Sequence, residues 1–285
     1  MSDRMGRSLL RTPTIGVYDV RCFAPAGGPG PDEQADQTQV VLPLAGVFEV
    51  HHGREAMTAD AASVVVFDAE RAHRVAHPAT GGDRSMVMVY APEVAEEALG
   101  GDGPRGGAVG SRVHLGARIL ASGLAREAIG ELEAEEMAIR LLDLISADLR
   151  GPHGYRPAPH QRDRIERVRA LLAVEPERRW RLDELARAVH CSPFHLARQF
   201  RALTGSSIWR HLLRLRMAVA LQRLAEGERD LAGLAADLGF ASQSHFGARF
   251  RSAFGAPPGR FRDTLAAGRL DELRTFVTAQ ERAAS

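Results

Sequence analysis

The C-terminal part of the sequence contains two copies of one short pattern, and this duplication constrains the fold more than any other feature. Residues 182–205 can be laid over residues 231–255, with Leu185 matching Leu234 and a glycine closing each copy. The second copy has one extra residue near its middle. Each copy predicts a short helix, a tight turn and a second helix, which is the helix-turn-helix arrangement. Two helical hairpins of an ordinary bundle are the alternative.

The ends of the second helix in each copy support this interpretation. Ser192 and Ser242 stand where a hydroxyl can accept hydrogen bonds from the free N–H groups of a helix start, and Pro193 suits the first helical position. Gly205 and Gly255 suit the left-handed conformation that often ends a helix. Both copies therefore predict a second helix with a defined start and stop.

The segment between the copies, 206–226, is rich in Leu, Met and Ala and predicts a helix. At a rise of about 1.5 Å per residue, this helix would be roughly 31 Å long. That length is close to one turn of B-DNA, ~34 Å, so helices held at its two ends would fit successive segments of a major groove.

The basic residues are distributed unevenly. Residues 161–262 hold 19 arginines against ten aspartates and glutamates, a balance of +9, whereas the net charge of the whole chain is +1. All 37 basic residues are arginine. A basic module joined to an acidic remainder indicates a nucleic-acid partner for the basic part.

The N-terminal part has the pattern of strands. Four segments rich in β-branched residues are separated by Gly, Asp and Pro clusters: 38–44, 46–52, 62–69 and 85–91. Short strands at this spacing predict an antiparallel barrel or sandwich. The glycine-rich segment 100–110 predicts a loop, and the Leu, Ile and Ala residues of 114–150 recur at helical spacing.

Composition excludes several classes of protein. The longest apolar run, 40–48, is far shorter than the ~20 residues that cross a bilayer. No apolar run follows the N-terminal arginines, so we expect no secretory signal. Two cysteines, Cys22 and Cys191, cannot build a disulfide framework or a four-ligand zinc site. We therefore expect a cytoplasmic protein without a membrane partner.

In its order and spacing, 162–262 resembles the AraC/XylS-type transcription regulators. The residues that carry the resemblance are Leu185, Ala186, Ser192, Pro193, Leu196, Ala197, Arg198, Phe200, Arg201, Gly205, Leu215, Arg216, Ala220, Leu234, Ala235, Gly239, Phe240, Ser244, His245, Phe246, Phe250, Arg251, Phe254, Gly255, Pro258, Phe261 and Arg262. The N-terminal part is similar, more loosely, to the cupin-like barrels of many such regulators. The resemblance implies promoter binding, control of transcription, and often an effector or dimer contact in the barrel.

The predicted fold class is α+β: an N-terminal antiparallel, cupin-like β-barrel with helices, then an all-α domain of two helix-turn-helix units joined by a long helix. We place the barrel at 1–112, a helical dimerisation segment at 113–150 and a linker at 151–161. Packing against its own barrel is the alternative for the helical segment. The DNA-binding domain is placed at 162–265, with units at 182–203 and 231–254, before a helical tail at 266–285.

A helical wheel separates the core side of the second helix in the first copy from its outer side. It places Leu196, Phe200 and Leu203 inward. The candidates for DNA contact are Phe194, His195, Ala197, Arg198 and Arg201. We expect Arg198 to contact a guanine edge, Phe194 a thymine methyl and Arg201 a phosphate. A solvated helix face is the alternative.

In the second copy the candidates for DNA contact are Gln243, Ser244, His245, Gly247, Ala248, Arg249 and Arg251. The family pattern has an arginine at the position of Ala248, and the wheel turns the neighbouring Arg249 toward the side of the helix. We therefore hypothesise that the first copy carries most base recognition. The second copy would mainly position the protein, with Arg251 on a phosphate and Gly247 allowing close approach to the DNA backbone.

For the barrel, Phe67, Arg74 and Tyr90 are candidates for lining an effector pocket, because cupin-like barrels enclose cavities. Four histidines raise the question of a metal: His51, His52, His73 and His77. His51 and His52 are adjacent and would point to opposite faces of a strand, and the metal-binding cupin pattern is incomplete although Glu55 follows. We therefore expect hydrogen-bonded or solvated histidines, no metal and no cofactor.

The sequence thus predicts a DNA-binding transcription regulator, with activation taken as its mode of control and repression as the alternative. Its expected partners are double-stranded promoter DNA, RNA polymerase, a second copy of the chain and a small-molecule effector. No catalytic residues are expected, because the glutamates of 131–136 belong to a solvated helix and no other catalytic pattern occurs. The alternatives are a cupin-type metalloenzyme that uses its helices for docking and an architectural DNA binder without sequence preference.

Overall fold

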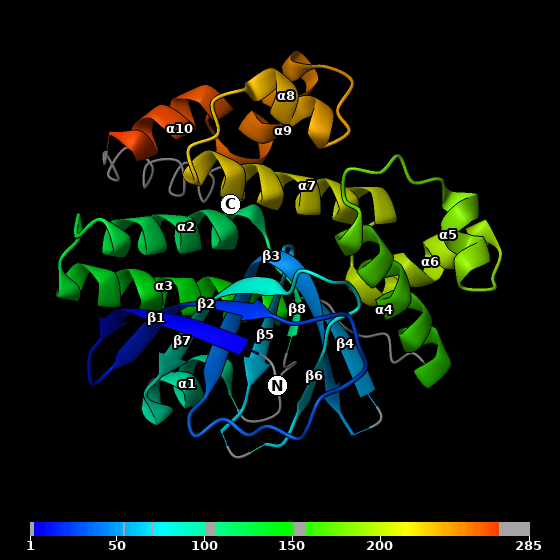
Figure 1. Ribbon diagram of the computed structural model, residues 1–285. Helices are drawn as coiled ribbons and strands as arrows, with labels where there is room; N and C mark the ends of the chain where they lie inside the picture. Colours follow the sequence, from blue (N-terminus) through cyan, green and yellow to red (C-terminus); the bar gives the residue numbers. More distant parts are fainter. Residues whose placement is uncertain (1–2, 54, 70, 101–105, 151–157, 268–285) are drawn as a thin grey trace.

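The computed structural model describes residues 3–53, 55–69, 71–100, 106–150 and 158–267. A sheet-built N-terminal half lies beside a helical C-terminal half, with two helices between them (Figure 1). None of the helices in these ranges is both long and apolar enough to span a bilayer.

Eight strands form one antiparallel sheet within the described residues. Their bounds are β1 (Asp3–Arg11), β2 (Ile15–Phe23), β3 (Gln39–His52), β4 (Glu55–Asp60), β5 (Ser63–Phe67), β6 (Arg74–Ala76), β7 (Asp83–Tyr90) and β8 (Gly106–Ala108). The strand order is β1-β2-β7-β3-β5-β8, and β4 and β6 pair with the second half of the long β3. The sheet therefore has two limbs joined along β3. One limb contains the first half of β3 with β1, β2, β5, β7 and β8, and the other contains its second half with β4 and β6. The expected antiparallel sheet is confirmed, whereas its closure into a cupin-like barrel stays a prediction.

The expected break between strands 38–44 and 46–52 was wrong, because β3 runs through both segments. Between Pro43 and Ala45 its pairing with β7 shifts register, which marks a bulge. Gly46 lies in the left-handed region at φ +79°, and a Cβ there would lie 2.3 Å from the carbonyl oxygen of Gly82. Glycine at 46 thus lets the strand bend and continue into the second limb instead of ending.

The loop expected at 100–110 was also wrong in part. Gly106–Ala108 form β8, which pairs with β5 at the edge of the sheet, while 101–105 lie outside the described residues. A Cβ on Gly106 would lie 2.9 Å from the carbonyl oxygen of Val64 and nearer still to the side chain of Met57. The missing side chain therefore lets this short strand approach β5. Sequence patterns did not predict β1, β2, β4 or β6.

Ten helices lie within the described residues. Their bounds are α1 (Pro92–Leu99), α2 (Ser111–Ala125), α3 (Glu131–Leu149), α4 (Pro159–Val174), α5 (Leu182–Ala188), α6 (Pro193–Thr204), α7 (Ile208–Ala225), α8 (Leu231–Asp237), α9 (Gln243–Phe254) and α10 (Pro258–Ala266). The duplication is confirmed: α5 and α8 have seven residues each, and α6 and α9 have twelve each. The turn in the second unit is one residue longer, as the sequence indicates.

The helix between the two units is shorter than expected. The prediction of 206–226 was wrong at both ends, since α7 has 18 residues and is about 27 Å long at 1.5 Å per residue. The Ser207 hydroxyl caps its first turn by accepting from the N–H of Arg210, and Ser206 belongs to the turn that follows Gly205. The helical segment 114–150 is likewise two helices, separated by a turn in which Glu127 has φ +54°.

The segments expected to link and to end the domains are only partly described. Residues 151–157 of the linker and 268–285 of the tail lie outside the described ranges. Helix α4 begins at Pro159, three residues earlier than the expected start of the DNA-binding domain, because proline suits the first helical position.

Four apolar clusters hold these elements together, and α2 belongs to two of them. Val113, Ala117 and Leu120 pack with α3 against the sheet. Leu115 and Ile119 pack instead with α7, α9 and α10. A third cluster joins α4–α7 to the β4–β5 turn, and a fourth lies between the two limbs of the sheet. Leu115, Ile119 and Leu120 of α2 are therefore buried within a single chain, as in the packing alternative to a dimer interface.

Candidate nucleic-acid interface

The second helix of the first unit, α6, presents the expected outer face to solvent. Leu196 and Phe200 are fully buried, and Leu203 is half-buried. The residues expected to contact DNA are all exposed: Phe194, His195, Ala197, Arg198 and Arg201. Phe194 is 76% exposed, which is unusual for an apolar aromatic side chain and leaves it free to contact another molecule.

The second helix of the other unit, α9, has the same arrangement. Phe246, Phe250 and Phe254 are buried, and the ring of Phe250 contacts the other two edge-on or tilted, with centroids 4.7–5.7 Å apart. The opposite side carries the expected contact residues. Gln243, Ser244, Ala248, Arg249 and Arg251 are exposed, and His245 and Gly247 are half-exposed.

Both helices begin at a capped, open N-terminus. The hydroxyl of Ser192 accepts from the N–H of His195 at 3.3 Å, and the hydroxyl of Ser242 accepts from the N–H of His245 at 3.1 Å. Both helices end at a glycine in the left-handed region, with φ +67° at Gly205 and +78° at Gly255. The expected starts and stops are confirmed, and each helix offers a positive N-terminus to an anion such as a phosphate.

The arginines of the basic module fall into two groups. Many have partners inside the protein: Arg216, for example, donates to the carbonyl oxygen of Pro176 at 2.7 Å, and Arg223 pairs with Asp237 at 2.7 Å. Arg198, Arg201 and Arg251 make no ion pair with any residue in the described part of the chain. The arginines whose charge is uncompensated thus include those on the outer faces of α6 and α9.

Arg249 lies differently from these three. Its Nε donates to Nε2 of His245 at 3.4 Å, one turn earlier on α9. The wheel turns Arg249 toward the side of the helix, and this contact with His245 is consistent with that direction. A Cβ on Gly247 would meet nothing within 4 Å, so packing within the chain does not require a glycine there.

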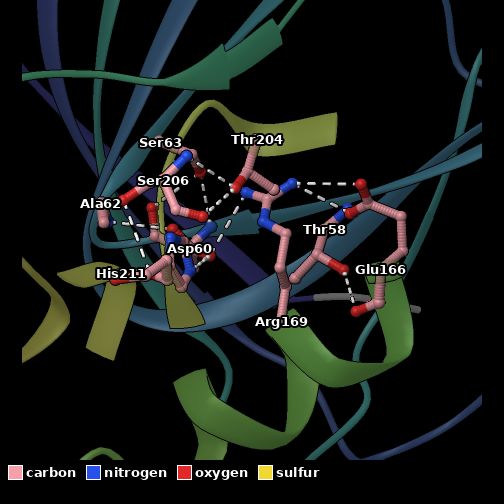
Figure 2. Close-up of polar contacts among 10 residues, drawn as sticks. Thr58, Asp60, Ala62, Ser63, Glu166, Arg169, Thr204, Ser206 and His211 are labelled. Carbon is pink, nitrogen blue, oxygen red and sulfur yellow. Dashed lines mark hydrogen bonds and ion pairs between the residues drawn. The ribbon is translucent and has the colours of Figure 1, made fainter. Parts of the chain in front are cut away.

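The first unit is fixed to the sheet through a buried polar cluster that Figure 2 shows. Asp60, at the end of β4, lies between Arg169 of α4 and His211 of α7. One Asp60 oxygen is 3.2 Å from the Arg169 guanidinium and 3.1 Å from Nε2 of His211, and neither Asp60 nor His211 has any exposed side-chain surface.

Neighbouring contacts complete this cluster. Glu166 of α4 accepts from the backbone N–H of Thr58 at 2.7 Å and pairs with Arg169 at 2.9 Å, while the hydroxyl of Thr58 donates to the Glu166 carbonyl oxygen. Burial alone would raise the pKa of Asp60, but the Arg169 guanidinium and His211 hold that pKa well below its usual range. Asp60 is therefore ionised and compensates a buried cation.

Nothing in the sequence pattern pointed to this cluster. Asp60 lies in a short turn between strands, and its partners are about 110 and 150 residues away in the chain. A contact between segments so far apart leaves no periodicity or spacing that a single sequence can display.

The second unit meets the sheet half at a separate surface. Leu115 and Ile119 of α2 complete its apolar core, and Arg126 donates to the carbonyl oxygen of Leu265 in α10. Arg84 of β7 pairs with Glu226 at the end of α7 at 2.8 Å. Both units are thus packed against elements of the N-terminal half.

A cavity of about 230 Å³ lies between the two limbs of the sheet. Of the residues expected to line an effector pocket, Phe67 lines this cavity together with Val41 and Phe48. Tyr90 is buried on the opposite face of β7, where its hydroxyl donates to the carbonyl oxygen of Ala138 at 2.9 Å. Arg74 is partly exposed and lies 3.7 Å from Asp32.

The four histidines of the sheet have different neighbours. His51 lies 3.4 Å from Glu49, and Nδ1 of His52 lies 3.3 Å from the carbonyl oxygen of Ala72. His73 and His77 line the cavity, and the centroid of the His73 ring lies 6.1 Å from that of His52. The structure therefore does not bring all four together.

Comparison with known proteins shows what part of the helical half is similar to. Residues 185–264 match the family described as a helix-turn-helix domain. The chain is 34% identical over 91 residues to a Streptomyces lividans protein described as an AraC-like transcription regulator, covering 32% of this chain and 30% of that one. It is 31% identical over 102 residues to the RCS-specific HTH-type transcriptional activator RclR of Escherichia coli, covering 36% of each.

A longer but weaker match extends toward the N-terminal half. The HTH-type transcriptional activator RhaR of Salmonella schwarzengrund is 26% identical over 190 residues, covering 61% of this chain and 67% of that one. Among solved structures, ToxT from Vibrio cholerae is 11% identical over 87% of this chain and 98% of its own, with a TM-score of 0.36. By contrast, the match to the Streptomyces lividans protein and to RclR spans only about a third of the length of each of these two relatives.

Proposed function

We propose that this protein is a sequence-specific DNA-binding regulator of transcription, because residues 185–264 match a helix-turn-helix domain and are similar to AraC-like regulators. In this proposal α6 and α9 enter successive segments of the major groove of promoter DNA. A single chain would then recognise two short blocks of sequence.

The observation that carries the proposal is the matching pair of outer faces on α6 and α9. Arg201 and Arg251 occupy corresponding positions, both are exposed, and neither is paired with a described residue. Uncompensated arginines on capped helices provide the charge that attracts phosphates. Arg198 and Phe194, which are also exposed, have the chemistry that distinguishes guanine and thymine edges.

Selection from a random duplex library by the full-length protein, at stated salt, tests this proposal. We expect enrichment of two short blocks with centres about one helical turn, ~10 base pairs, apart. Strong binding without enrichment would contradict sequence recognition and favour an architectural DNA binder. Absence of binding would contradict the DNA partner itself.

We further propose that the N-terminal half modulates DNA binding. The Asp60 cluster holds α4 and α7 against the sheet, and α2 completes the core of the second unit. A small molecule in the cavity beside Phe67 would act on β3, the strand that also pairs with β4 and its Asp60 turn. To test this coupling, the melting temperature and the DNA affinity of the protein would both be measured with and without each compound of a small-molecule library. A ligand that raises the melting temperature without changing the DNA affinity would contradict the coupling.

The remaining partners are also proposals. A homodimer would use the outer face of α3, where Leu132 is 71% and Ile139 is 37% exposed. Light scattering of the protein and of Leu132→Glu tests this surface, and equal masses for the two would contradict it. We propose action in the cytoplasm, where bacterial promoters lie, with activation through RNA polymerase as the mode of control.

A further inference from the structure

The cavity between the limbs of the sheet has a polar end at which three metal-ligating side chains meet. Cys22, His77 and Asp83 each offer one donor atom, and these atoms lie within 4.8 Å of one another. Cys22 is 4% exposed, and the side chains of His77 and Asp83 are 7% and 9% exposed. Elsewhere in the described ranges no other such group of His, Cys, Asp and Glu occurs.

The fold builds this meeting point from segments about 60 residues apart. Cys22 of β2 and Asp83 of β7 are direct partners in the β-ladder, so their side chains lie next to each other on one face. His77 follows β6, and its carbonyl oxygen accepts from the N–H of Gly27 at 3.0 Å. A Cβ on Gly82, at φ +69°, would lie 1.7 Å from the carbonyl oxygen of Cys22. The turn that carries Asp83 is thus held close against β2.

The polar contacts orient these groups. Nε2 of His77 lies 3.0 Å from one oxygen of Asp83, and the hydroxyl of Ser85 donates to the other oxygen at 2.8 Å. A ligating carboxylate held by a neighbouring hydroxyl is typical of protein metal sites, where such partners fix the ligand's direction.

Sulfur, imidazole nitrogen and carboxylate oxygen together form a ligand set that suits Zn²⁺. Zinc bonds of about 2.0–2.3 Å in a tetrahedral site place its ligands about 3.5 Å apart. Donor atoms already within 4.8 Å of each other reach that spacing by small side-chain rotations. The walls beyond them are apolar and include Val41, Phe48 and Phe67.

We propose that the N-terminal sheet binds one Zn²⁺ ion through Cys22, His77 and Asp83, with the fourth coordination position open to the cavity. The thiol of Cys22 gives its proton to solvent when the sulfur binds the metal. Three protein ligands with one open position leave room for a water molecule or a donor group of a small ligand. The site differs from the cupin pattern considered from the sequence, because neither His51, His52 nor Glu55 belongs to it. It rests on the sheet alone and does not depend on DNA binding.

Cobalt spectroscopy of the full-length protein, prepared without a histidine tag, tests the site. Co²⁺ replaces Zn²⁺ in tetrahedral sites and gives a sulfur-to-cobalt charge-transfer band only when a thiolate is bound. We expect one Co²⁺ per chain, a charge-transfer band, and loss of that band when one equivalent of Zn²⁺ is added.

The chain offers a matched control because it has only two cysteines. Cys191→Ser, in the turn before α6, should keep the band, whereas Cys22→Ser should lose it and weaken Zn²⁺ binding at least tenfold. Asp83→Asn should weaken binding while keeping the thiolate band at higher Co²⁺. Circular dichroism confirms that each variant is folded.

Several results would overturn the proposal. These are a wild-type protein that binds no stoichiometric metal, a band that survives in Cys22→Ser, and a band that disappears in Cys191→Ser. If Cys22→Ser does not fold, the wild-type and Cys191→Ser titrations still decide, because Cys22 is then the sole source of a thiolate band.

Discussion

Asp60 and His211 lie 151 residues apart in the sequence, and their side chains meet at 3.1 Å without exposure to solvent. Asp60 belongs to the sheet, and His211 belongs to the helix that joins the two helix-turn-helix units. The position of that helix is therefore tied to the turn between β4 and β5. Any movement of this turn must either move α7 or break this buried hydrogen bond.

Breaking the buried ion pair between Asp60 and Arg169 should be costly. We expect Asp60→Asn to lower the free energy of unfolding by about 3 kcal/mol, because it leaves the buried Arg169 with one counter-ion fewer. Urea unfolding at pH 7 measures the change. Asp183→Asn is the matched control, since Asp183 pairs with Arg187 at 3.2 Å on the surface and should contribute much less to stability than the buried pair. Similar losses for both variants would contradict a structural role for the buried cluster.

His114 of α2 should make the protein less stable in mild acid. Burial, with a smaller contribution from Arg118, lowers the pKa of His114 to about 4. Between the ordinary histidine value of 6.5 and pH 4, the unfolded chain therefore binds a proton that the folded chain excludes. The free energy of unfolding should fall by up to ~3 kcal/mol as the pH decreases across this window.

His114→Leu should flatten that pH dependence, as measured by urea unfolding at several pH values from 7 to 4. The exposed His160 provides the control, because His160→Gln should leave the slope unchanged. Asp60 contributes in a different pH range. Because its pKa is lowered in the folded protein, the ionised Asp60 stabilises the fold at pH values above the ordinary carboxyl pKa of 3.8, and this contribution is lost only as the pH falls below that value. An unchanged slope in His114→Leu would contradict the assignment.

The two second helices should differ in what they contribute to DNA binding. We expect Arg198→Ala to relax base preference at one position by ~1–3 kcal/mol, because a bidentate contact with guanine would be lost. Arg251→Ala should weaken all sequences alike and reduce the salt dependence by about one phosphate contact. Binding assays on matched and mismatched duplexes at several salt concentrations separate these effects.

Two further variants make this comparison decisive. Arg21→Ala, an exposed arginine of the sheet, controls for the loss of one positive charge and should change neither property. Ser244→Ala should alter base preference less than Arg198→Ala. Equal loss of preference in these two variants would contradict the division of labour between α6 and α9.

Gly247 should show opposite effects on stability and on DNA binding. A Cβ at this half-exposed helical position meets nothing within 4 Å, so Gly247→Ala should raise the free energy of unfolding by ~0.5–1 kcal/mol. If the glycine permits close approach to the DNA backbone, the same variant should bind DNA more weakly. Gly205→Ala is the contrast, because φ there is +67° and alanine should destabilise the protein. Unchanged DNA affinity in Gly247→Ala would contradict close approach.

Local patterns in the sequence were sufficient to predict the two units. The capping serines, Ser192 and Ser242, and the capping glycines, Gly205 and Gly255, interact with residues within one helical turn. Their positions in the sequence therefore indicate where each helix starts and stops. The inward direction of Leu196 and Phe200 follows from helical periodicity alone.

The sheet was harder to predict because its strands depend on distant partners. Gly46 resembles a turn residue, yet β3 continues through it because β7 pairs with the strand on both sides of the bulge. Cys22 and Asp83 become neighbours only through the β2–β7 register, and Asp60 meets Arg169 only through packing of the two halves. Contacts between such distant segments can be identified only once the fold is known.

The double packing of α2 limits how this protein can exchange parts with its relatives. Val113, Ala117 and Leu120 face the sheet, while Leu115 and Ile119 face the second unit. A chimaera that joins this sheet to the helix-turn-helix module of a relative would bury Leu115 and Ile119 against a foreign surface. The two halves must therefore be inherited together, or compensating substitutions must arise on α2.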